Sequence, residues 1–404
     1  MEYKLLSSVF YSDNSYYEEL YNKRFNSEST CRFNFKINGY NAFVIINNEI
    51  LQKFDEIMEL DKKLMKMMDS VPEIALIQYI RKCLIDEIKM TNEIEGVNST
   101  RKEINDILND KTQKNKRKRL YGLVKKYEKL LKDDIVELKT CNDIRKLYDE
   151  LVLQEVIEED EKNKPDGEIF RVGKVFVQNS IGKNIHDGVY PESKIIEYMT
   201  DGLDVLNNDK YNFLIRIAVF HYMFGYIHPF YDGNGRMSRF ISSYLLSKKL
   251  QVVVSYRIAY TIKKNIDSYY KSFKIANDPK NRGDLTSFVI RFFNILIQSL
   301  NDLHDSLKEK RDRLFYFCDL SEKICFENKK LSNILFILVQ NSLFGDEGLT
   351  VEEIKEISGV GESKVRNCLK ELDEKNMINI EKESRKKLYS ANLEKMSEFN
   401  NSSN

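Results

Sequence analysis

The segment Phe213–Tyr226 is apolar on almost every side of the helix that its sequence predicts. Its large apolar residues include Ile217, Phe220 and Phe224, and no polar face remains to meet solvent. A helix of this kind is stable only where other elements cover it all round. It is shorter than the ~18 apolar residues that indicate a membrane span. We therefore expect Phe213–Tyr226 to be the buried centre of a helical bundle.

The composition also favours helices. Only 5 prolines and 16 glycines occur among the 404 residues, a length that suits two or three domains. Apolar residues recur at helical spacing from Asn48 to Met90, with a break at Pro72, and Gly96 suits the end of the second helix. Further helices are predicted within 101–155 and at 193–207, 235–249, 265–276 and 285–310. Residues 1–50 are predicted to be irregular.

Two regions depart from this pattern. Between residues 160 and 192, β-prone residues such as Val175 and Phe176 lie among glycines that include Gly182, which predicts a hairpin or extended flap. After Lys330, helix, helix, turn, helix and two short strands follow one another in winged-helix order. Thr350 and Glu353 form a capping box at the start of one of these helices. The fold class that we predict is mainly α.

Composition and charge argue against several classes of protein. The net charge of +1 does not indicate a globally basic nucleic-acid binder. The six cysteines include no C-x-x-C pair, which argues against a disulfide framework or a zinc site and favours a reducing compartment. The first residues become polar too soon for a signal peptide. We expect a cytoplasmic protein without a membrane partner. The basic run at 114–119 is predicted to be a solvated helix face or a connection in preference to a nucleic-acid patch, because acidic residues follow it directly.

The strongest chemical signal is the segment His228–Arg239, His-Pro-Phe-Tyr-Asp-Gly-Asn-Gly-Arg-Met-Ser-Arg. Its first part is predicted to be a loop between the end of one helix and the start of the next, whose unpaired amides and dipole favour an anion. Gly233 and Gly235 allow a phosphate to approach the backbone. Arg236 and Arg239 are three residues apart, so we expect both on one face of the second helix.

Two guanidinium groups beside such an anion site suggest a polyphosphate. Asp232 then has the role of a Mg²⁺ ligand, because Mg²⁺ is usually held by one or two carboxylates together with phosphate oxygens. His228 is left as the base that removes a proton from an attacking hydroxyl.

The segment resembles the signature of the Fic family, His-Pro-Phe-x-(Asp/Glu)-Gly-Asn-Gly-Arg-x-x-Arg, at every defined position. The resemblance implies a Fic helical bundle and the transfer of AMP from Mg·ATP to a Ser, Thr or Tyr hydroxyl of a protein, with release of pyrophosphate. It implies that His228 deprotonates the hydroxyl and that Asp232 holds Mg²⁺. Asn234, with the amides of Gly233 and Gly235, would cradle the phosphates, and Arg236 and Arg239 would meet the β- and γ-phosphates.

Residues outside this segment extend the resemblance. Thr91-Asn92-Glu93-Ile94-Glu95-Gly96 is similar to the inhibitory motif of the family, which implies that Glu95 pairs with Arg239 and blocks the productive pose of ATP. The flap is implied to bind an extended target segment by strand addition, and His186 within it is predicted to be structural. Asn265, Tyr269 and Tyr270 resemble positions near the adenine.

The predicted domains are an N-terminal region with the inhibitory helix (1–110), a Fic catalytic core with the flap (111–310) and a winged-helix-like domain (325–400). The last of these carries Lys364, Arg366, Lys370, Arg385, Lys386 and Lys387 among nearly as many acidic residues, so DNA binding is less favoured than protein interaction or dimerisation. Three functions stay open: a self-inhibited protein adenylyltransferase, a transcriptional regulator with the Fic core as nucleotide sensor, and removal of AMP. The target protein, which includes the chain itself as a candidate, and a homodimer are left open.

Overall fold

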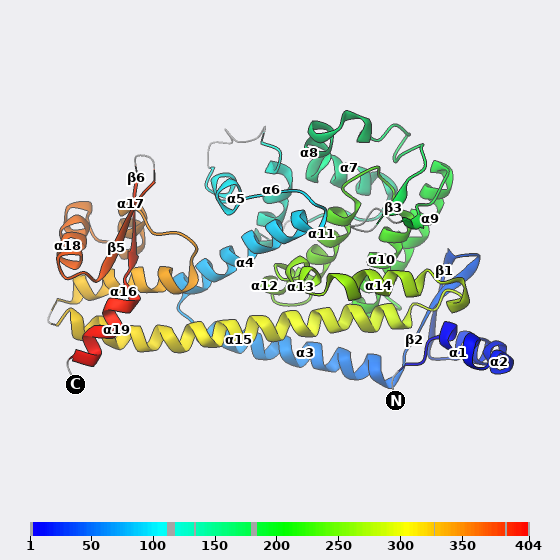
Figure 1. Cartoon of the computed structure of the whole chain (residues 1–404), viewed down its shortest axis with the longest axis horizontal. Helices are drawn as coiled ribbons and strands as arrows, with labels where there is room; N and C mark the ends of the chain where they lie inside the picture. Colours follow the sequence, from blue (N-terminus) through cyan, green and yellow to red (C-terminus); the bar gives the residue numbers. More distant parts are fainter. Residues whose placement is uncertain are drawn as a thin grey trace. The chain divides into compact units, whose positions relative to one another are not determined.

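The computed structural model describes residues 3–110, 118–132, 135–178, 184–326, 328–383 and 386–402. The fold is mainly helical, as predicted, and the chain divides into two compact units (Figure 1). The first unit comprises residues 1–62 and 84–301, and the second comprises residues 63–83 and 302–404. Three helices contribute residues to both units: α3 (Asn48–Asp69), α4 (Glu73–Ile94) and α15 (Thr286–Ile324). The three-part division drawn from the sequence stays a prediction.

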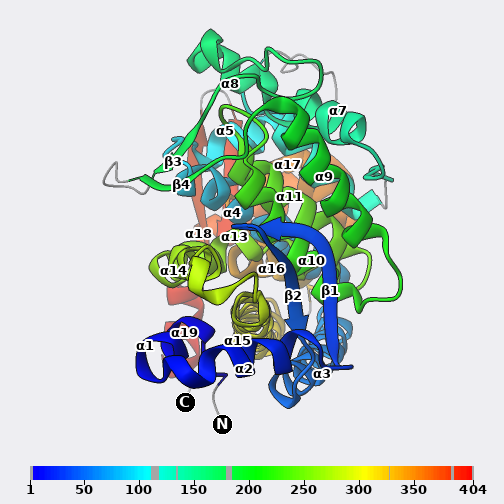
Figure 2. The same cartoon turned by 90° about the vertical axis from the view of Figure 1, so that its right-hand side faces the viewer.

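The apolar helix α10 (Phe213–Ile227) lies at the centre of the first unit, as predicted. Almost all of its side chains are buried. Figure 2 shows α9 (Glu192–Asn207), α10 and α11 (Asn234–Ser247) side by side, and α10 packs against both neighbours. The polar segment begins where α10 ends and continues into the start of α11. None of the helices in the described part of the chain has the length and hydropathy to cross a bilayer.

The N-terminal region is ordered, so the prediction of an irregular segment was wrong. Residues 6–45 form α1 (Leu6–Ser12), α2 (Asn14–Phe25) and the antiparallel pair β1 (Thr30–Ile37) and β2 (Tyr40–Ile45). Asn38 and Gly39 connect the strands with φ values of +49° and +86°. An Asn-Gly pair between alternating apolar residues is a strong hairpin signal, so the information was present in the sequence and was missed.

The other elements of the first unit are largely those expected. The β3–β4 pair confirms the predicted hairpin, although residues 179–183 between its strands, which include Gly182, lie outside the described residues. Of the basic run, 114–117 also lie outside them, whereas Lys118 pairs with Asp106 and Arg119 with Glu103. The bounds are α5 (Arg101–Leu108), α6 (Tyr121–Lys129), α7 (Cys141–Leu151), α8 (Leu153–Glu159), β3 (Phe176–Gln178), β4 (Asn184–Asp187), α12 (Val252–Ser255), α13 (Ile258–Lys264) and α14 (Ile266–Ala276).

The second unit has the order of elements that the sequence predicted for a winged helix. After α16 come α17, α18 and the antiparallel strands β5 and β6. The capping box of Thr350 and Glu353 is present, and Gly359 ends α17 with a φ of +67°. The final helix, α19, was not predicted. The bounds are α16 (Lys329–Phe344), α17 (Val351–Ser358), α18 (Glu362–Glu374), β5 (Ile378–Glu383), β6 (Lys386–Ala391) and α19 (Leu393–Ser402).

Candidate active site

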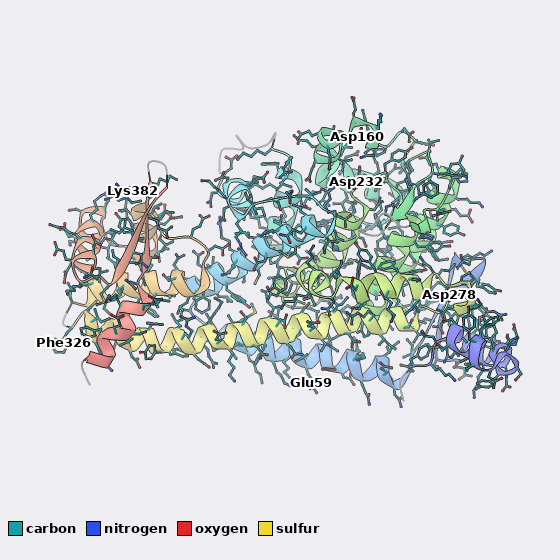
Figure 3. All side chains as sticks on the ribbon, viewed as in Figure 1. Glu59, Asp160, Asp232, Asp278, Phe326 and Lys382 are labelled. Carbon is teal, nitrogen blue, oxygen red and sulfur yellow. The ribbon has the colours of Figure 1, made fainter. Side chains whose placement is uncertain are left out.

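The polar segment forms the junction between α10 and α11. His228 follows the last residue of α10 with φ and ψ of 52° and 62°, a left-handed conformation that stops the helix. Gly233, with a φ of +78°, precedes the first residue of α11. Figure 3 labels Asp232 in this loop. The sequence predicted the loop and both helix ends, and the structure confirms them.

A cavity of about 230 Å³ opens at this junction. Of the residues predicted for the site, seven contribute to its wall: Glu95, His228, Asn234, Gly235, Arg239, Tyr269 and Tyr270. Asp232, Gly233 and Arg236 are not among the lining residues. The flap contributes Phe176 and His186, and α10 and α14 contribute Gly225 and Phe273. The cavity is therefore polar at the α11 end and aromatic at the α14 end.

Glu95 and Arg239 form an ion pair in this cavity, as the resemblance implied. Oε1 of Glu95 accepts a hydrogen bond from Nη2 of Arg239 at 2.7 Å. The side chain of Glu95 is 23% exposed and that of Arg239 is 2% exposed. Burial acts to raise the pKa of Glu95, but the charge and hydrogen bond of Arg239 outweigh it and lower that pKa below its usual range. Glu95 is therefore ionised at neutral pH.

Thr91 completes the environment of Arg239. Its hydroxyl accepts a hydrogen bond from Nε of Arg239 at 2.8 Å, and its carbonyl accepts one from Nη2 at 3.0 Å. Thr91 lies in the last turn of α4, and Glu95 directly follows the helix. The end of α4 thus occupies Nε and Nη2 of this guanidinium.

The carboxylate of Glu95 lies directly against Gly235, in the first turn of α11. A Cβ placed on Gly235 would overlap Oε1 of Glu95 and would come within 2.9 Å of Nη1 of Arg239. Only glycine leaves room for this approach. An anion that binds at the start of α11 would therefore meet Glu95 first.

Arg236 is fully buried and points to a different partner from Arg239. Its Nη1 donates to Oε2 of Glu155 on α8 at 2.7 Å, and its Nη2 lies 3.6 Å from Oδ2 of Asp232. Arg236 and Arg239 thus have carboxylate partners on separate elements, and their joint contact with a polyphosphate stays a prediction. Nε and Nη2 of Arg236 have no hydrogen-bond partner among the described residues, and such buried donors suit an anion.

The side chain of Asn234 holds the loop together. Its Oδ1 accepts from the amide of Phe230 at 2.9 Å, and its Nδ2 donates to the carbonyl of Phe230 at 2.8 Å. These two bonds close the loop across four residues. The side chain of Asn234 thus fixes the shape of the loop while it also lines the cavity, and its contact with phosphate stays a prediction.

The imidazole of His228 is held neutral. Burial lowers the pKa of His228 to about 4, an effect that Glu95 opposes and Arg171 increases. A neutral ring can accept a proton, but a base with a pKa near 4 is weak at neutral pH. Phosphate groups in the cavity would add negative charge and raise this pKa.

A buried histidine that sequence reasoning missed, His221, contacts Tyr269 of the aromatic wall. Nε2 of His221 lies 2.8 Å from the hydroxyl oxygen of Tyr269, and Nδ1 lies 2.8 Å from Oγ of Ser242. Burial lowers the pKa of His221 to about 3. Asn265, by contrast, donates to Thr261 and Gln298 and does not line the cavity.

Asp232 is suited to a magnesium ion. One of its oxygens accepts a hydrogen bond from the amide of Gly233, and its side chain remains 33% exposed. Among the described residues no group of three or more His, Cys, Asp or Glu could hold a metal by itself. A single carboxylate that leaves the remaining positions to phosphate oxygens and water is the usual Mg²⁺ arrangement beside a nucleotide.

The flap lies over the cavity. Phe176 on β3 is 57% exposed although it lines the cavity. His186 on β4 contacts the carbonyl of Tyr226 through Nε2 at 2.8 Å, and its ring lies against the ring of Tyr226. This supports the structural role that was predicted for His186.

Glu155 and Arg171 are the site residues for which the sequence offered no local signal. Glu155 is an ordinary glutamate on a short helix, and its pairing with Arg236 joins positions 81 residues apart. Arg171 is fully buried and contacts the carbonyl of His228. Only the tertiary structure identifies either residue.

Parts of the chain are similar to known proteins. Residues 140–246 match the model of the Fic/DOC family, and residues 339–393 match that of the sugar-specific transcriptional regulator TrmB. A Fic family protein from Desulfovibrio desulfuricans G20 has a similar structure, with a TM-score of 0.52 and 18% identity over 86% of this chain and 96% of that one. A Fic domain containing signaling protein from Bacteroides thetaiotaomicron VPI-5482 gives a TM-score of 0.44 and 20% identity over 63% and 97% of the two chains.

Proposed function

Because residues 140–246 form a domain of the Fic/DOC family, we propose that this protein is a protein adenylyltransferase. In this proposal it transfers AMP from ATP to a Ser, Thr or Tyr hydroxyl of a protein. The observation that supports it best is that one cavity holds His228, the first turn of α11 and Arg239. A proton acceptor, an anion site and a fixed positive charge are what nucleotidyl transfer to a hydroxyl requires.

The chemical step is a displacement at the α-phosphorus of ATP. The hydroxyl oxygen of the target forms a bond to that phosphorus while the bond to the bridging oxygen of the β-phosphate breaks, and pyrophosphate leaves. His228 takes the proton of the hydroxyl. The amides at the start of α11 would stabilise the phosphate charge, together with the Nε and Nη2 groups of Arg236, which make no hydrogen bond to the described residues. Asp232 would hold Mg²⁺, which neutralises charge on the phosphates when it is bound.

The resting protein is self-inhibited in this proposal. Glu95 occupies the guanidinium group of Arg239 and lies against Gly235. Both are places that a polyphosphate would need. ATP then binds in its productive pose only when Glu95 leaves. A hydrogen bond to a charged group contributes roughly 1.5–3 kcal/mol, which corresponds to about a ten- to hundredfold change in an equilibrium.

Intact-mass measurement after incubation with Mg·ATP tests both parts of the proposal. The variant Glu95→Gly should gain one AMP, or transfer it to an added protein, at least about tenfold faster than the parent protein. Glu93→Gly is the matched control, because Glu93 lies two residues away and pairs with Lys89 instead. The double variant Glu95→Gly with His228→Ala should gain none. Equal rates for Glu95→Gly and the parent would exclude the self-inhibition.

Removal of AMP is the alternative reaction for the same cavity. The ionised carboxylate of Glu95 would then orient a water molecule instead of excluding ATP. Incubation of a target that already carries AMP separates the two reactions. Release of AMP that is lost in Glu95→Gly would favour removal.

A role in transcription is the second candidate, and the match of residues 339–393 favours it. The charges on α18 argue against direct reading of DNA. Arg366 pairs with Glu362 at 2.7 Å, Lys375 with Glu371 at 2.8 Å, and Lys370 with Glu374 at 3.7 Å. Basic side chains that are already paired with carboxylates neutralise few DNA phosphates and so release few counterions from DNA.

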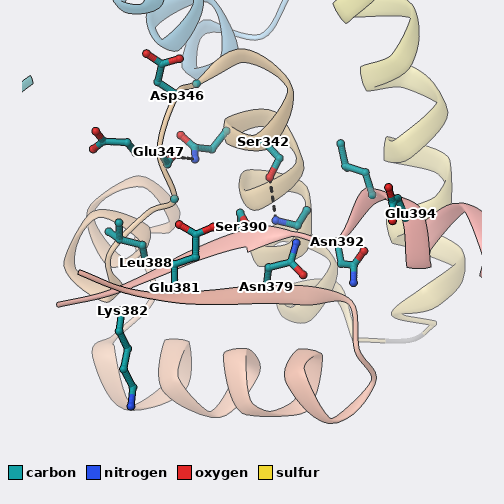
Figure 4. Close-up of a pocket in the computed structure, with 15 residues that line it drawn as sticks. Ser342, Asp346, Glu347, Asn379, Glu381, Lys382, Leu388, Ser390, Asn392 and Glu394 are labelled. Carbon is teal, nitrogen blue, oxygen red and sulfur yellow. Dashed lines mark hydrogen bonds between the residues drawn. The ribbon is translucent and has the colours of Figure 1, made fainter. Parts of the chain in front are cut away.

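One cleft in the second unit has more acidic than basic side chains in its described lining. It has a volume of about 770 Å³, and its lining includes Asp346, Glu347, Glu381 and Glu394 together with Lys382 (Figure 4). Lys382 points to the opposite face of the strand pair from Glu381, as successive strand residues do (Figure 4). Arg385 of the predicted basic set lies outside the described residues. A salt-dependent gel shift with short duplexes decides this candidate, since no shift at low salt would exclude it.

A further inference from the structure

Arg171 is a fully buried arginine that donates only to backbone carbonyls in the described structure. Its Nε donates to the carbonyl of His228 at 2.9 Å. Its Nη1 donates to Gly173 at 2.5 Å, and its Nη2 donates to Val189 at 2.9 Å and to Ile227 at 3.5 Å. A single planar guanidinium group thus connects three separate stretches of the backbone.

The end of α10 and the carboxylate of Asp166 both favour the charged form of Arg171. Ile227 and His228 carry two of the carbonyls that a helix C-terminus leaves without a partner, and the helix dipole places negative charge there. Burial lowers the pKa of Arg171 to about 10, so the side chain stays charged at neutral pH. The cation therefore stabilises the helix end at the residue where the chain turns into its left-handed conformation.

The same group reaches both legs of the flap. Gly173 precedes β3 and Val189 follows β4. Two backbone bonds reinforce this point: the amide of Val189 donates to Ile227 at 3.1 Å, and the amide of Gly188 donates to Val175 at 3.1 Å. A Cβ on Gly188 would come within 2.6 Å of Nη2 of Arg171, so the close packing requires glycine there.

We propose that Arg171 is a positioning residue that fixes His228 and both legs of the flap to one point. The flap would present the target hydroxyl, and His228 would receive its proton, so the distance between the two depends on this shared anchor. The inference rests on the proposed adenylyl transfer. Arg171 does not line the cavity, and it therefore acts on the geometry of the reaction and not on ATP binding.

Kinetics in the Glu95→Gly background test this role. Arg171→Met should lower kcat on the order of tenfold or more, because a displacement of about 1 Å between reacting groups is this costly. The KM for ATP should stay within about twofold, since no ATP contact is lost. Arg171→Lys keeps the charge and part of the hydrogen bonding, so its kcat should lie between those of Arg171→Met and the parent.

Arg145→Met is the matched control. Arg145 also donates to a backbone carbonyl near the flap, that of Ile169 at 2.9 Å, but its other described partner is Asp149. Its kcat should equal that of the background protein. An unchanged kcat in Arg171→Met would overturn the proposal, and so would an equal loss in Arg145→Met. If Arg171→Met does not fold, Arg171→Lys decides, and a rise in the KM for ATP without a fall in kcat would overturn the proposal.

Hydrogen–deuterium exchange separates this proposal from the proposed function. The amide of Val189, which bonds to Ile227, should exchange faster in Arg171→Met than in Arg145→Met, whether or not AMP is transferred. Faster exchange without any transfer by the Glu95→Gly background would contradict adenylyl transfer and leave the anchor standing. Unchanged exchange would overturn the anchor itself.

Discussion

Oε1 of Glu95 lies 2.7 Å from Nη2 of Arg239, although 144 positions separate the two residues in the sequence. The pair joins the end of α4 to α11 across the cavity, and Thr91 in the last turn of α4 supports it. The carboxylate of Glu95 lies at the start of α11, where an anion would otherwise bind. Loss of Glu95 therefore changes both the binding of anions and the stability of the fold.

Glu95→Gly should lower the free energy of unfolding by roughly 1–3 kcal/mol in the absence of nucleotide, because Arg239 then lacks a charged partner while nearly buried. ATP should restore most of this loss, since its phosphates supply new acceptors. Urea unfolding with and without Mg·ATP measures both effects. A variant as stable as the parent, or one that ATP stabilises no more than the parent, would contradict this prediction.

Glu155→Gln should destabilise the protein by about 3 kcal/mol, because the buried guanidinium of Arg236 loses its nearer carboxylate partner and keeps only the longer contact with Asp232. Glu159→Gln on the same helix is the control, since Glu159 is exposed, and it should change stability by less than about 0.5 kcal/mol. Denaturant unfolding compares the two variants. Similar losses in both would show that the pair contributes nothing specific.

Asp232→Ala, placed in the Glu95→Gly background, should reduce transfer of AMP by about a hundredfold or more at millimolar Mg²⁺. The reason is that the phosphates would lose the carboxylate that positions their cation. Titration of Mg²⁺ against the rate provides the measurement. The prediction fails if the variant and its background reach the same maximal rate at the same Mg²⁺ concentration.

The buried His221 should make the protein sensitive to acid. Burial lowers the pKa of His221 to about 3 in the folded state, while the unfolded chain takes up the proton near 6.5. Between these values the unfolded state binds more protons, so stability is present above pH 6.5 and is lost as the pH falls, by up to about 1.4 kcal/mol per pH unit. His221→Asn should flatten this slope in unfolding experiments from pH 4 to 7. A slope equal to that of the parent would contradict the prediction.

Glu87 should have the opposite pH dependence. Burial raises the pKa of Glu87 to about 7, although its carboxylate accepts hydrogen bonds from the amide of Ala259 at 2.8 and 2.9 Å. The folded state then holds a proton that the unfolded state has lost, so stability is full below about pH 4.5 and declines as the pH rises to about 7. The groups that face this carboxylate are Arg239, Arg257, Tyr127 and Tyr256.

Glu87→Gln tests this dependence. The variant removes the titrating group and keeps an acceptor for the amide of Ala259. The difference in free energy of unfolding between Glu87→Gln and the parent should therefore grow in favour of the variant between pH 4.5 and 7. A difference that is constant with pH would show that Glu87 does not titrate in this range.

The sequence predicted most of the fold where local signals are strong. Apolar periodicity predicted the helix at 213–227, and β-prone residues among glycines predicted the flap strands. A capping box and the order of the elements predicted the winged helix. The prediction failed at α2, whose tyrosines lie on several sides of the helix and give no apolar stripe. The β1–β2 hairpin was missed although its Asn-Gly turn was visible.

By itself the sequence determined which chemistry the segment His228–Arg239 offers, because its groups are contiguous and two helix ends hold them together. The tertiary structure alone decided their partners. Arg236 pairs with Glu155, the side-chain amide of Asn234 bonds to Phe230 in its own loop, and Arg171 donates to the carbonyl of His228. Burial decides such partners, because a polar or charged group removed from water costs free energy unless the surrounding side chains or backbone supply a hydrogen-bond partner. No local pattern encodes that choice.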